Sequence, residues 1–368
     1  MPVCLRDLEP VLTGLSGVRQ NPVYHGEGDA LTHTRLVMEA MQGMPSFQAL
    51  DEPGRRLMLT AAALHDLGKK VCTKLEDGQW TSPRHSVVGA GMVRELLMTR
   101  FDLGGTPEAL TEREAICALV RWHMRPTHIL EGEHPGRTVR QMAAMGELTP
   151  AFTLERLAML AESDNRGRIC ADQQAQLEAV SLFAELAAEE GCDHGPFTYP
   201  DGYSRYADFS GRSVVPGQRL YDDTWGTVIM LSGLPGTGKD TYISRHCADL
   251  PMLSLDELRR ELGVSPRDDQ GAVIQQARER ARELLRRRQP FVFNATNLSV
   301  MLRRKWIALF HQYGASVRIV YLETPWAERE RRNQSRQHRV PEEAVRDMLR
   351  HLEPPTLAEA EGVTWLCV

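Results

Sequence analysis

The sequence lacks the features that mark secreted, membrane-spanning and repetitive proteins. Its beginning, MPVCLRDLEP, has no signal-peptide pattern, and no apolar run approaches the roughly 20 residues that cross a bilayer. The seven cysteines are scattered without a C-x-x-C pair, and we find no internal repeats. This pattern favours reduced thiols, argues against a structural zinc knuckle, and leads us to expect a cytoplasmic protein with no membrane contact.

The sequence also lacks a large excess of either positive or negative charge. The 368 residues carry a net charge of −5, with 42% hydrophobic and 25% charged residues. Mild acidity argues against a protein that coats nucleic acid non-specifically, although it leaves room for a local basic patch. The length and the apolar content suit two domains with separate cores.

The first half of the chain has a helical pattern. Apolar residues recur at three- and four-residue spacing, and Gly and Pro fall mainly between the stretches that show it. These stretches are 55–67, 86–100, 111–124 and 152–190. Strand alternation is not evident between residues 30 and 190. We therefore predict an all-α domain over residues 1–190.

Residues 191–225 differ in composition, because Gly, Pro, Asp and aromatic residues dominate them. We interpret this segment as a structured linker. Its aromatic and arginine side chains suit two roles, either anchors that hold the linker against a domain or platforms that stack on nucleic-acid bases. These side chains are Tyr199, Tyr203, Arg205, Tyr206, Phe209 and Arg212.

From residue 226 onwards, short apolar runs alternate with helical patterns. The strand candidates are 227–232, 252–255, 291–294, 316–323 and 364–368. Such alternation predicts an α/β domain over residues 226–368, with a mostly parallel sheet covered on both faces. The charged segment 268–289 is typical of a solvated helix with one buried stripe.

Histidines and aspartates with metal-ligand chemistry are spread over the helical half. His65 and Asp66 stand side by side in the apolar segment AAALHDLGKK, where either would be costly to bury without a partner. A lone histidine is more often structural, but further candidates lie in or beside predicted helices. A bundle would project them into one core. The candidates are His33, His65, Asp66, His85, His123 and Asp164.

These residues provide enough ligands for one ion or for two. His33, His65, Asp66 and Asp164 would hold the first ion, and His85 and His123 would hold a second, bridged through Asp66. Imidazole and carboxylate ligands suit magnesium or a divalent transition metal of the Mn, Ni, Co or Zn class. Two such ions activate water and stabilise the leaving oxygen of a phosphoester. Lys69, one helical turn after Asp66, would meet the phosphate charge.

This pattern resembles a known family. His33, the pair in HDLGK and Asp164 match the HD phosphohydrolase superfamily. The stretches NPVYHGEGDALTHTRLV, HSVVGAGMV and ESDNRGR are also similar to the HD domain appended to some bacterial CCA-adding enzymes. The resemblance covers roughly residues 20–170 and lacks those enzymes' nucleotidyltransferase domain. It implies a metal-dependent phosphohydrolase and, for that relative, action on 2′,3′-cyclic phosphates and 2′-phosphates at RNA ends.

The segment LSGLPGTGKDTY at residues 231–242 has most of a phosphate-binding loop. Its glycines let backbone N–H groups curl around a phosphate, and Lys239 would reach the β- and γ-phosphates. The loop follows a predicted strand and opens a helix, whose dipole favours an anion. We predict that ATP or another NTP binds here with Mg²⁺. The predicted contacts are Gly233, Gly236, Thr237, Gly238, Lys239, Asp240 and Thr241.

Asp240 departs from the pattern, which takes Ser or Thr directly after the lysine to ligate magnesium. A carboxylate at that position repels phosphate, yet it can hold magnesium directly or through water. The hydroxyl comes one residue later, at Thr241, and would still contact the α-phosphate. We therefore expect altered metal placement with phosphate binding retained.

Further kinase chemistry follows the loop. Asp256 comes after the second strand candidate, at the edge where parallel sheets place ligands, and would accept a hydroxyl proton. Arg259, one turn away, would hold a neighbouring substrate phosphate. Arg332 and Arg336 are four apart, so on a helix they share one face and would close as a lid. A solvated basic face fits this spacing equally. Asn294 and Asn297 are weaker candidates for positioning substrate or metal.

This half resembles 5′-hydroxyl polynucleotide kinases of the phage type over about residues 227–350. The matching segments are GLPGTGKDT, Asp256-x-x-Arg259, NATNL and R-N-Q-S-R at 332–336. The resemblance implies that Lys239 contacts the ATP phosphates and that Asp256 is the general base. It also implies that Arg259 binds the phosphate beside the acceptor nucleotide and that the two arginines of 332–336 belong to a lid.

The order of the two halves is similar to the bacterial end-healing family called HD-Pnk. This resemblance implies one chain that opens a 2′,3′-cyclic phosphate and phosphorylates a 5′-hydroxyl, on RNA or DNA ends that a separate ligase then joins. Both folds host other activities, so a nucleotidase fused to a nucleoside or small-molecule kinase is an alternative. Another is a regulatory module in which ATP binding gates the HD site or a partner protein.

Overall fold

The computed structural model describes residues 3–336 and 339–368. The chain divides into two compact units. The first unit contains the residues up to 104 together with 108–197, and the second contains 105–107 together with 198–368. No helix within the described ranges is both long and apolar enough to cross a bilayer.

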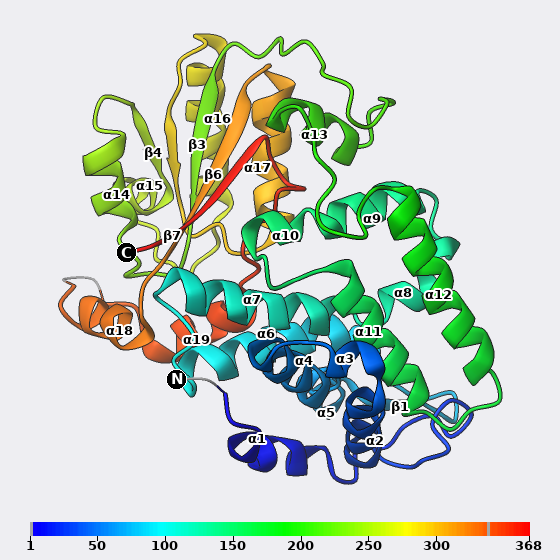
Figure 1. Ribbon diagram of the computed structural model, residues 1–368. Coiled ribbons are helices and arrows are strands. Elements are labelled where there is room, and N and C mark those ends of the chain that lie inside the picture. The colour runs from blue at the N-terminus through cyan, green and yellow to red at the C-terminus, as the bar shows by residue number, and fades with distance from the viewer. Residues whose placement is uncertain (1–2, 337–338) are drawn as a thin grey trace. The chain divides into compact units, whose positions relative to one another are not determined.

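The first unit is mainly helical (Figure 1). Its long helices are α2 (Ala30–Gly43), α4 (Glu52–Leu64), α6 (His85–Thr99), α7 (Pro107–Trp122), α11 (Leu154–Arg166) and α12 (Gln173–Glu189). Its short helices are α1 (Leu5–Leu12), α3 (Pro45–Gln48), α5 (Lys69–Cys72), α8 (Arg125–His128), α9 (Pro135–Ala143) and α10 (Met145–Leu148). Helices α2, α4 and α11 pack against one another. The predicted helical stretches are all present.

The all-α prediction was wrong in one detail, because the first unit also contains a hairpin. Strands β1 (Lys74–Glu76) and β2 (Gln79–Thr81) pair antiparallel. The two turn residues, Asp77 and Gly78, both have positive φ, at 49° and 78°. Asp-Gly is a strong hairpin signal because this tight turn needs left-handed backbone at both positions. The flanking strands are too short to show alternation in the sequence.

The second unit is built on a five-stranded sheet in which every pair is parallel. The strand order is β4 (Met252–Ser254), β5 (Val292–Asn294), β3 (Thr227–Ser232), β6 (Ser316–Glu323) and β7 (Gly362–Cys367). The helices are α13 (Gly202–Phe209), α14 (Lys239–His246), α15 (Leu255–Leu262), α16 (Gly271–Arg286), α17 (Val300–Gln312), α18 (Trp326–Gln334) and α19 (Glu342–Arg350). The predicted fold class, a helical domain followed by an α/β domain, is confirmed.

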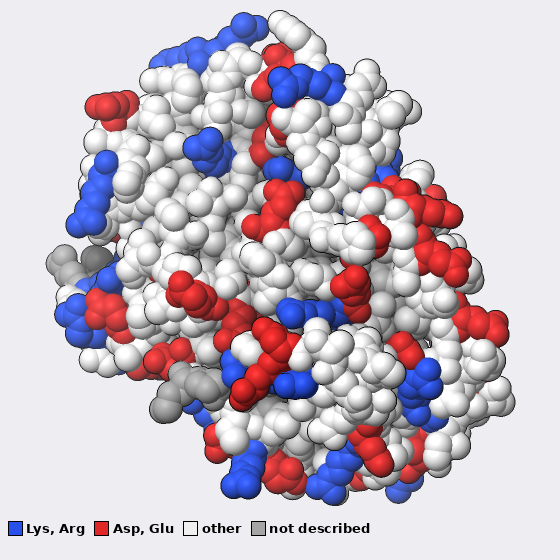
Figure 2. All heavy atoms as spheres, in the orientation of Figure 1, with Lys and Arg blue, Asp and Glu red and all other residues white. Residues whose placement is uncertain are grey.

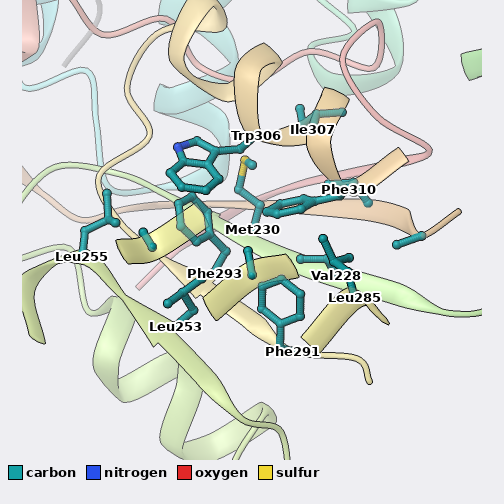
Figure 3. Close-up of a cluster of buried hydrophobic side chains, with 14 of the residues drawn as sticks. Val228, Met230, Leu253, Leu255, Leu285, Phe291, Phe293, Trp306, Ile307 and Phe310 are labelled. Carbon is teal, nitrogen blue, oxygen red and sulfur yellow. The ribbon is translucent and has the colours of Figure 1, made fainter. Parts of the chain in front are cut away.

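The main core of the second unit lies between the sheet and helices α16 and α17 (Figure 3). The ring centroid of Phe293 lies 4.5 Å from that of Trp306 and 5.9 Å from that of Phe310. Helix α16 buries a stripe of residues at four-residue spacing, as predicted for the charged segment. The stripe is Val273, Ala277, Ala281 and Leu285.

Most of the segment expected to be a linker packs on the second unit. It contains α13, where Tyr206 lies against His311 with ring centroids 4.5 Å apart. The guanidinium of Arg205 donates to the carbonyl of Glu361 at 2.9 Å. These contacts match the anchoring role rather than a free stacking platform.

Replacing Phe293 by Ala should remove much of this core packing. We expect a loss of about 3–5 kcal/mol in the free energy of unfolding of the second unit, because a large buried ring leaves a cavity. Chemical denaturation followed by circular dichroism measures it. Met301→Ala, at an exposed position on α17, is the matched control and should change stability by less than about 0.5 kcal/mol. Equal denaturation midpoints for the two variants would contradict the prediction.

Candidate functional site

The structure brings all six predicted metal ligands into one buried cluster. His33 comes from α2 and Asp164 from α11, while His65 and Asp66 directly follow the end of α4. His85 begins α6, and His123 directly follows α7. Each residue is at most 7% exposed. Helix α4 ends at Leu64, so the His-Asp pair lies in the turn that leaves the helix rather than within it.

The two oxygens of Asp66 face different groups of histidines. Oδ2 lies 3.2 Å from His65 Nε2 and 3.6 Å from His33 Nε2. Oδ1 lies 3.3 Å from His85 Nε2 and 4.0 Å from His123 Nε2. Asp66 therefore joins two sets of ligand atoms, each compact enough to surround a cation. This is the division expected for two ions that share one carboxylate.

Backbone carbonyls orient the imidazoles of three histidines. The Nδ1 atoms of His65, His85 and His123 lie 2.7, 2.9 and 2.7 Å from the carbonyl oxygens of Ala62, Ser82 and Val120. A carbonyl oxygen can accept a hydrogen bond but cannot donate one, so Nδ1 carries the hydrogen in each ring. Nε2 is then the unprotonated atom of the neutral ring, which is the form that binds metal.

The unpaired atoms at the centre of the cluster fit a metal ion. Among the described residues, His65 Nε2 and both oxygens of Asp66 are buried without a hydrogen bond of good geometry. Such atoms are costly to bury unless a cation satisfies them. Their imidazole and carboxylate chemistry suits a divalent transition metal or magnesium.

Electrostatics keep two of these ligands, Asp66 and His123, in their binding forms. Burial alone would raise the pKa of Asp66, but the charge of Lys69 holds it well below its usual range. Burial lowers the pKa of His123 to about 3, so its ring is neutral at ordinary pH. Lys69 Nζ lies 2.7 Å from Asp66 Oδ2 and donates to Gln20 Oε1 at 2.6 Å.

Sequence reasoning missed two charged residues that support the cluster. Glu27 Oε1 lies 2.9 Å from Nδ1 of His33, and the Arg168 guanidinium pairs with the carboxylate of Asp164. Both residues occur in stretches similar to HD domains. Glu27 lies in a loop without periodicity, and Arg168 follows the end of α11, so hydrophobic spacing gave no signal for either.

The second unit forms the expected phosphate-binding loop between β3 and α14. Gly233, Gly236 and Gly238 have φ values of 145°, 89° and 84°, which side chains disfavour. Lys239 Nζ donates to the carbonyls of Gly233 and Leu234 at 2.8 and 2.9 Å. Burial lowers the pKa of Lys239 to about 8.

Two predicted acids lie near Lys239. Asp240 is exposed in the first turn of α14, and its Oδ1 accepts a hydrogen bond from Asn294 Nδ2 at 3.0 Å. Asp256 is exposed in the first turn of α15, where it forms an ion pair with Arg259. Both carboxylates act to raise the pKa of Lys239 against the effect of burial, so both are within electrostatic range of its ammonium.

The expectation that Arg332 and Arg336 share a helix face was wrong. Helix α18 ends at Gln334, and Arg336 lies beyond it. Near the end of this helix, the side chain of Asn333 accepts from the N–H of Val340 and donates to its carbonyl, at 3.1 and 2.7 Å. Arg332 lies beside the loop. Its Nη1 is 3.5 Å from the position that a Cβ atom would occupy if Gly238 carried one.

Two other residues of the predicted kinase site have structural roles. Arg329, three residues before Arg332 on α18, is fully buried and paired with Glu342. Asn297 is also buried, and its Nδ2 donates to the carbonyl of Leu231 at 2.7 Å. Neither side chain is free to meet a substrate.

Metal content should follow the division of ligands around Asp66. After loading with Mn²⁺ and desalting, we expect two ions in the first unit of the unaltered chain, one in His123→Ala, and none in Asp66→Ala, which removes the shared ligand. Inductively coupled plasma mass spectrometry measures the stoichiometry. His128→Ala, a histidine outside the cluster, is the control. Full metal content in Asp66→Ala would show that this carboxylate is not a ligand.

Comparisons with known proteins match both halves of the chain. A family model described as an HD domain matches residues 31–162, and one described as an AAA domain matches residues 228–355. A multifunctional CCA protein of Halorhodospira halophila (strain DSM 244 / SL1) is 32% identical over 171 residues, which cover 45% of this chain. The match spans only 35% of that relative's length. The chain thus carries an HD phosphohydrolase domain followed by a P-loop kinase-like domain.

Proposed function

We propose that this chain is a bifunctional end-healing enzyme of the HD-Pnk type. Its HD domain would hydrolyse 2′,3′-cyclic phosphates and 2′-phosphates, and its P-loop domain would phosphorylate 5′-hydroxyl ends from ATP. One observation carries the proposal. The same chain contains both the ligand cluster around Asp66 and a phosphate-binding loop with Asp256 near its lysine. The similarity of the chain to a multifunctional CCA protein over 171 residues supports RNA ends as the substrate of the HD half.

In the HD domain, the protein prepares a hydrolytic site for a phosphoester. Divalent cations, when bound, would supply electrophilic assistance to the reacting phosphate. Asp66 stays ionised and links the two ligand groups, while the backbone carbonyls fix the orientation of the imidazoles. The ammonium group of Lys69 would then turn from Asp66 towards the substrate phosphate, where it would stabilise the developing negative charge.

In the kinase domain, Lys239 would exchange its bonds to the loop carbonyls for the β- and γ-phosphates of ATP. Asp256, at the carboxyl end of β4, would accept the proton of the attacking 5′-hydroxyl. Arg259, which contacts Asp256, would orient that carboxylate and bind the phosphate next to the acceptor. Arg332, whose guanidinium lies beside Gly238, would meet charge on the transferred group, and Arg336 would join it from the segment after α18.

A surface of mixed charge would favour binding at an end rather than along a strand. On the face drawn in Figure 2, Lys and Arg are interspersed with Asp and Glu. The net charge of −5 agrees with this mixture. Affinity for a polymer would then depend on the terminal nucleotides and their phosphates more than on a long run of backbone contacts.

The kinase assignment predicts a specific effect of Asp256→Ala. Transfer of labelled γ-phosphate from ATP to a 5′-hydroxyl oligonucleotide should fall by about 10²- to 10⁴-fold, because the general base is lost, while ATP affinity changes little. Asp249→Ala, an exposed aspartate of the same unit, is the control. If the unaltered chain binds ATP but phosphorylates no oligonucleotide, the kinase acts on small acceptors or the domain is a sensor.

The HD assignment predicts a separate effect of Lys69→Ala. Hydrolysis of an RNA 2′,3′-cyclic phosphate end should fall by roughly 10- to 100-fold while metal content is kept, because the lysine acts on the phosphate charge. The assay is release of the ring-opened and dephosphorylated products, separated by chromatography. Lys70→Ala, the exposed neighbouring lysine, is a matched control. Equal rates in the two variants would exclude this role for Lys69.

A further inference from the structure

Asp240 stands where phosphate-binding loops carry the neutral hydroxyl that ligates magnesium. The residue lies in the first turn of α14, directly after Lys239, so the triphosphate bound by this loop would approach it closely. Thr241, the next residue, has an exposed side chain but points about 100° further round the helix. A carboxylate has therefore replaced the hydroxyl at this position.

A neighbouring strand holds this carboxylate in place. Asn294 ends β5, which lies between β3 and β4, and it pairs in register with Ser254. Its Nδ2 donates to Asp240 Oδ1 at 3.0 Å, and Asn294 itself is only 8% exposed. Among the described residues, no other side chain donates a hydrogen bond to Asp240. The Oδ2 atom is thus left for another partner.

The free oxygen has the chemistry that magnesium prefers. Mg²⁺ takes hard oxygen ligands, and one carboxylate together with substrate phosphates is a common set. The charge on Asp240 also has a cost, because it repels a triphosphate when no cation lies between them. The same residue would therefore oppose the nucleotide alone and favour the nucleotide with its cation.

We propose that Asp240, oriented by Asn294, is a ligand of the nucleotide's divalent cation and makes nucleotide binding depend on that cation. The inference rests on the proposed nucleotide site. It adds a ligand with a charge that the hydroxyl of the usual motif lacks. Since linkage is reciprocal, ATP must raise the affinity of the site for the cation by the same factor that the cation raises its affinity for ATP.

The test is titration of the full chain with ATP by isothermal calorimetry, in excess EDTA and in excess Mg²⁺. The measured quantity is the ratio of the two dissociation constants. EDTA strips cations from the HD domain equally in every variant, so differences between variants report on the loop. Asp240→Ser restores the neutral hydroxyl, and Asp240→Asn is an isosteric neutral change. Asp249→Ser is the matched control at an exposed aspartate.

We expect Asp240→Ser and Asp240→Asn to bind ATP about tenfold more tightly than the unaltered chain in EDTA, because repulsion between like charges is removed. The gain on adding Mg²⁺ should shrink in both variants. Asn294→Ala keeps the charge, so its affinity in EDTA should not change while its gain from Mg²⁺ falls about tenfold. A purely structural role of Asn294 would instead lower both affinities together.

The outcomes separate this inference from the proposed function. An equal gain from Mg²⁺ in the unaltered chain and in Asp240→Ser would overturn the inference, since Asp240 would then not contact the cation. Failure of ATP to bind under both conditions would overturn the inference and the kinase assignment together. The predicted binding pattern without phosphorylation of oligonucleotides would uphold the role of Asp240 and reject the polynucleotide substrate.

Discussion

The burial of one carboxylate among four histidines is the constraint on which the first unit depends. Asp66 is 1% exposed, and its two oxygens face His65 and His33 on one side and His85 and His123 on the other. This arrangement is unfavourable without positive charge at its centre, because His65 Nε2 and both Asp66 oxygens are buried without a hydrogen bond of good geometry. The surrounding helices are therefore organised to deliver ligands and to orient them through carbonyls, rather than to maximise apolar packing at this point.

The second unit depends on a different constraint, the common direction of its strands. All five strands are parallel, so their carboxyl ends meet at one edge of the sheet. The phosphate-binding loop follows β3, Asp256 follows β4, and Asn294 ends β5. Residues far apart in the chain therefore reach one site, because each follows the carboxyl end of a parallel strand and these ends lie at the same edge of the sheet. The aromatic core around Phe293 supports that edge from one face of the sheet.

The two units solve the problem of holding phosphate in complementary ways. In the proposed function, the imidazole and carboxylate ligands of the HD domain would act on phosphate through cations. The backbone N–H groups and the lysine of the P-loop domain would contact phosphate directly. By our proposal, Asp240 would add a cation-mediated contact to the second domain, because a carboxylate repels a triphosphate unless a cation lies between them.

The sequence by itself determined the two fold classes, the strands of the second unit and most of the residue types at both sites. Hydrophobic periodicity and short motifs are local, and they place His65, Asp66 and the loop glycines without knowledge of the fold. Tertiary structure alone decided how Asp66 divides its oxygens, that Asn294 holds Asp240, and that Arg336 lies beyond α18. It also revealed Glu27 and buried Arg329. These features are contacts between distant segments, and local spacing carries no record of which side chains meet.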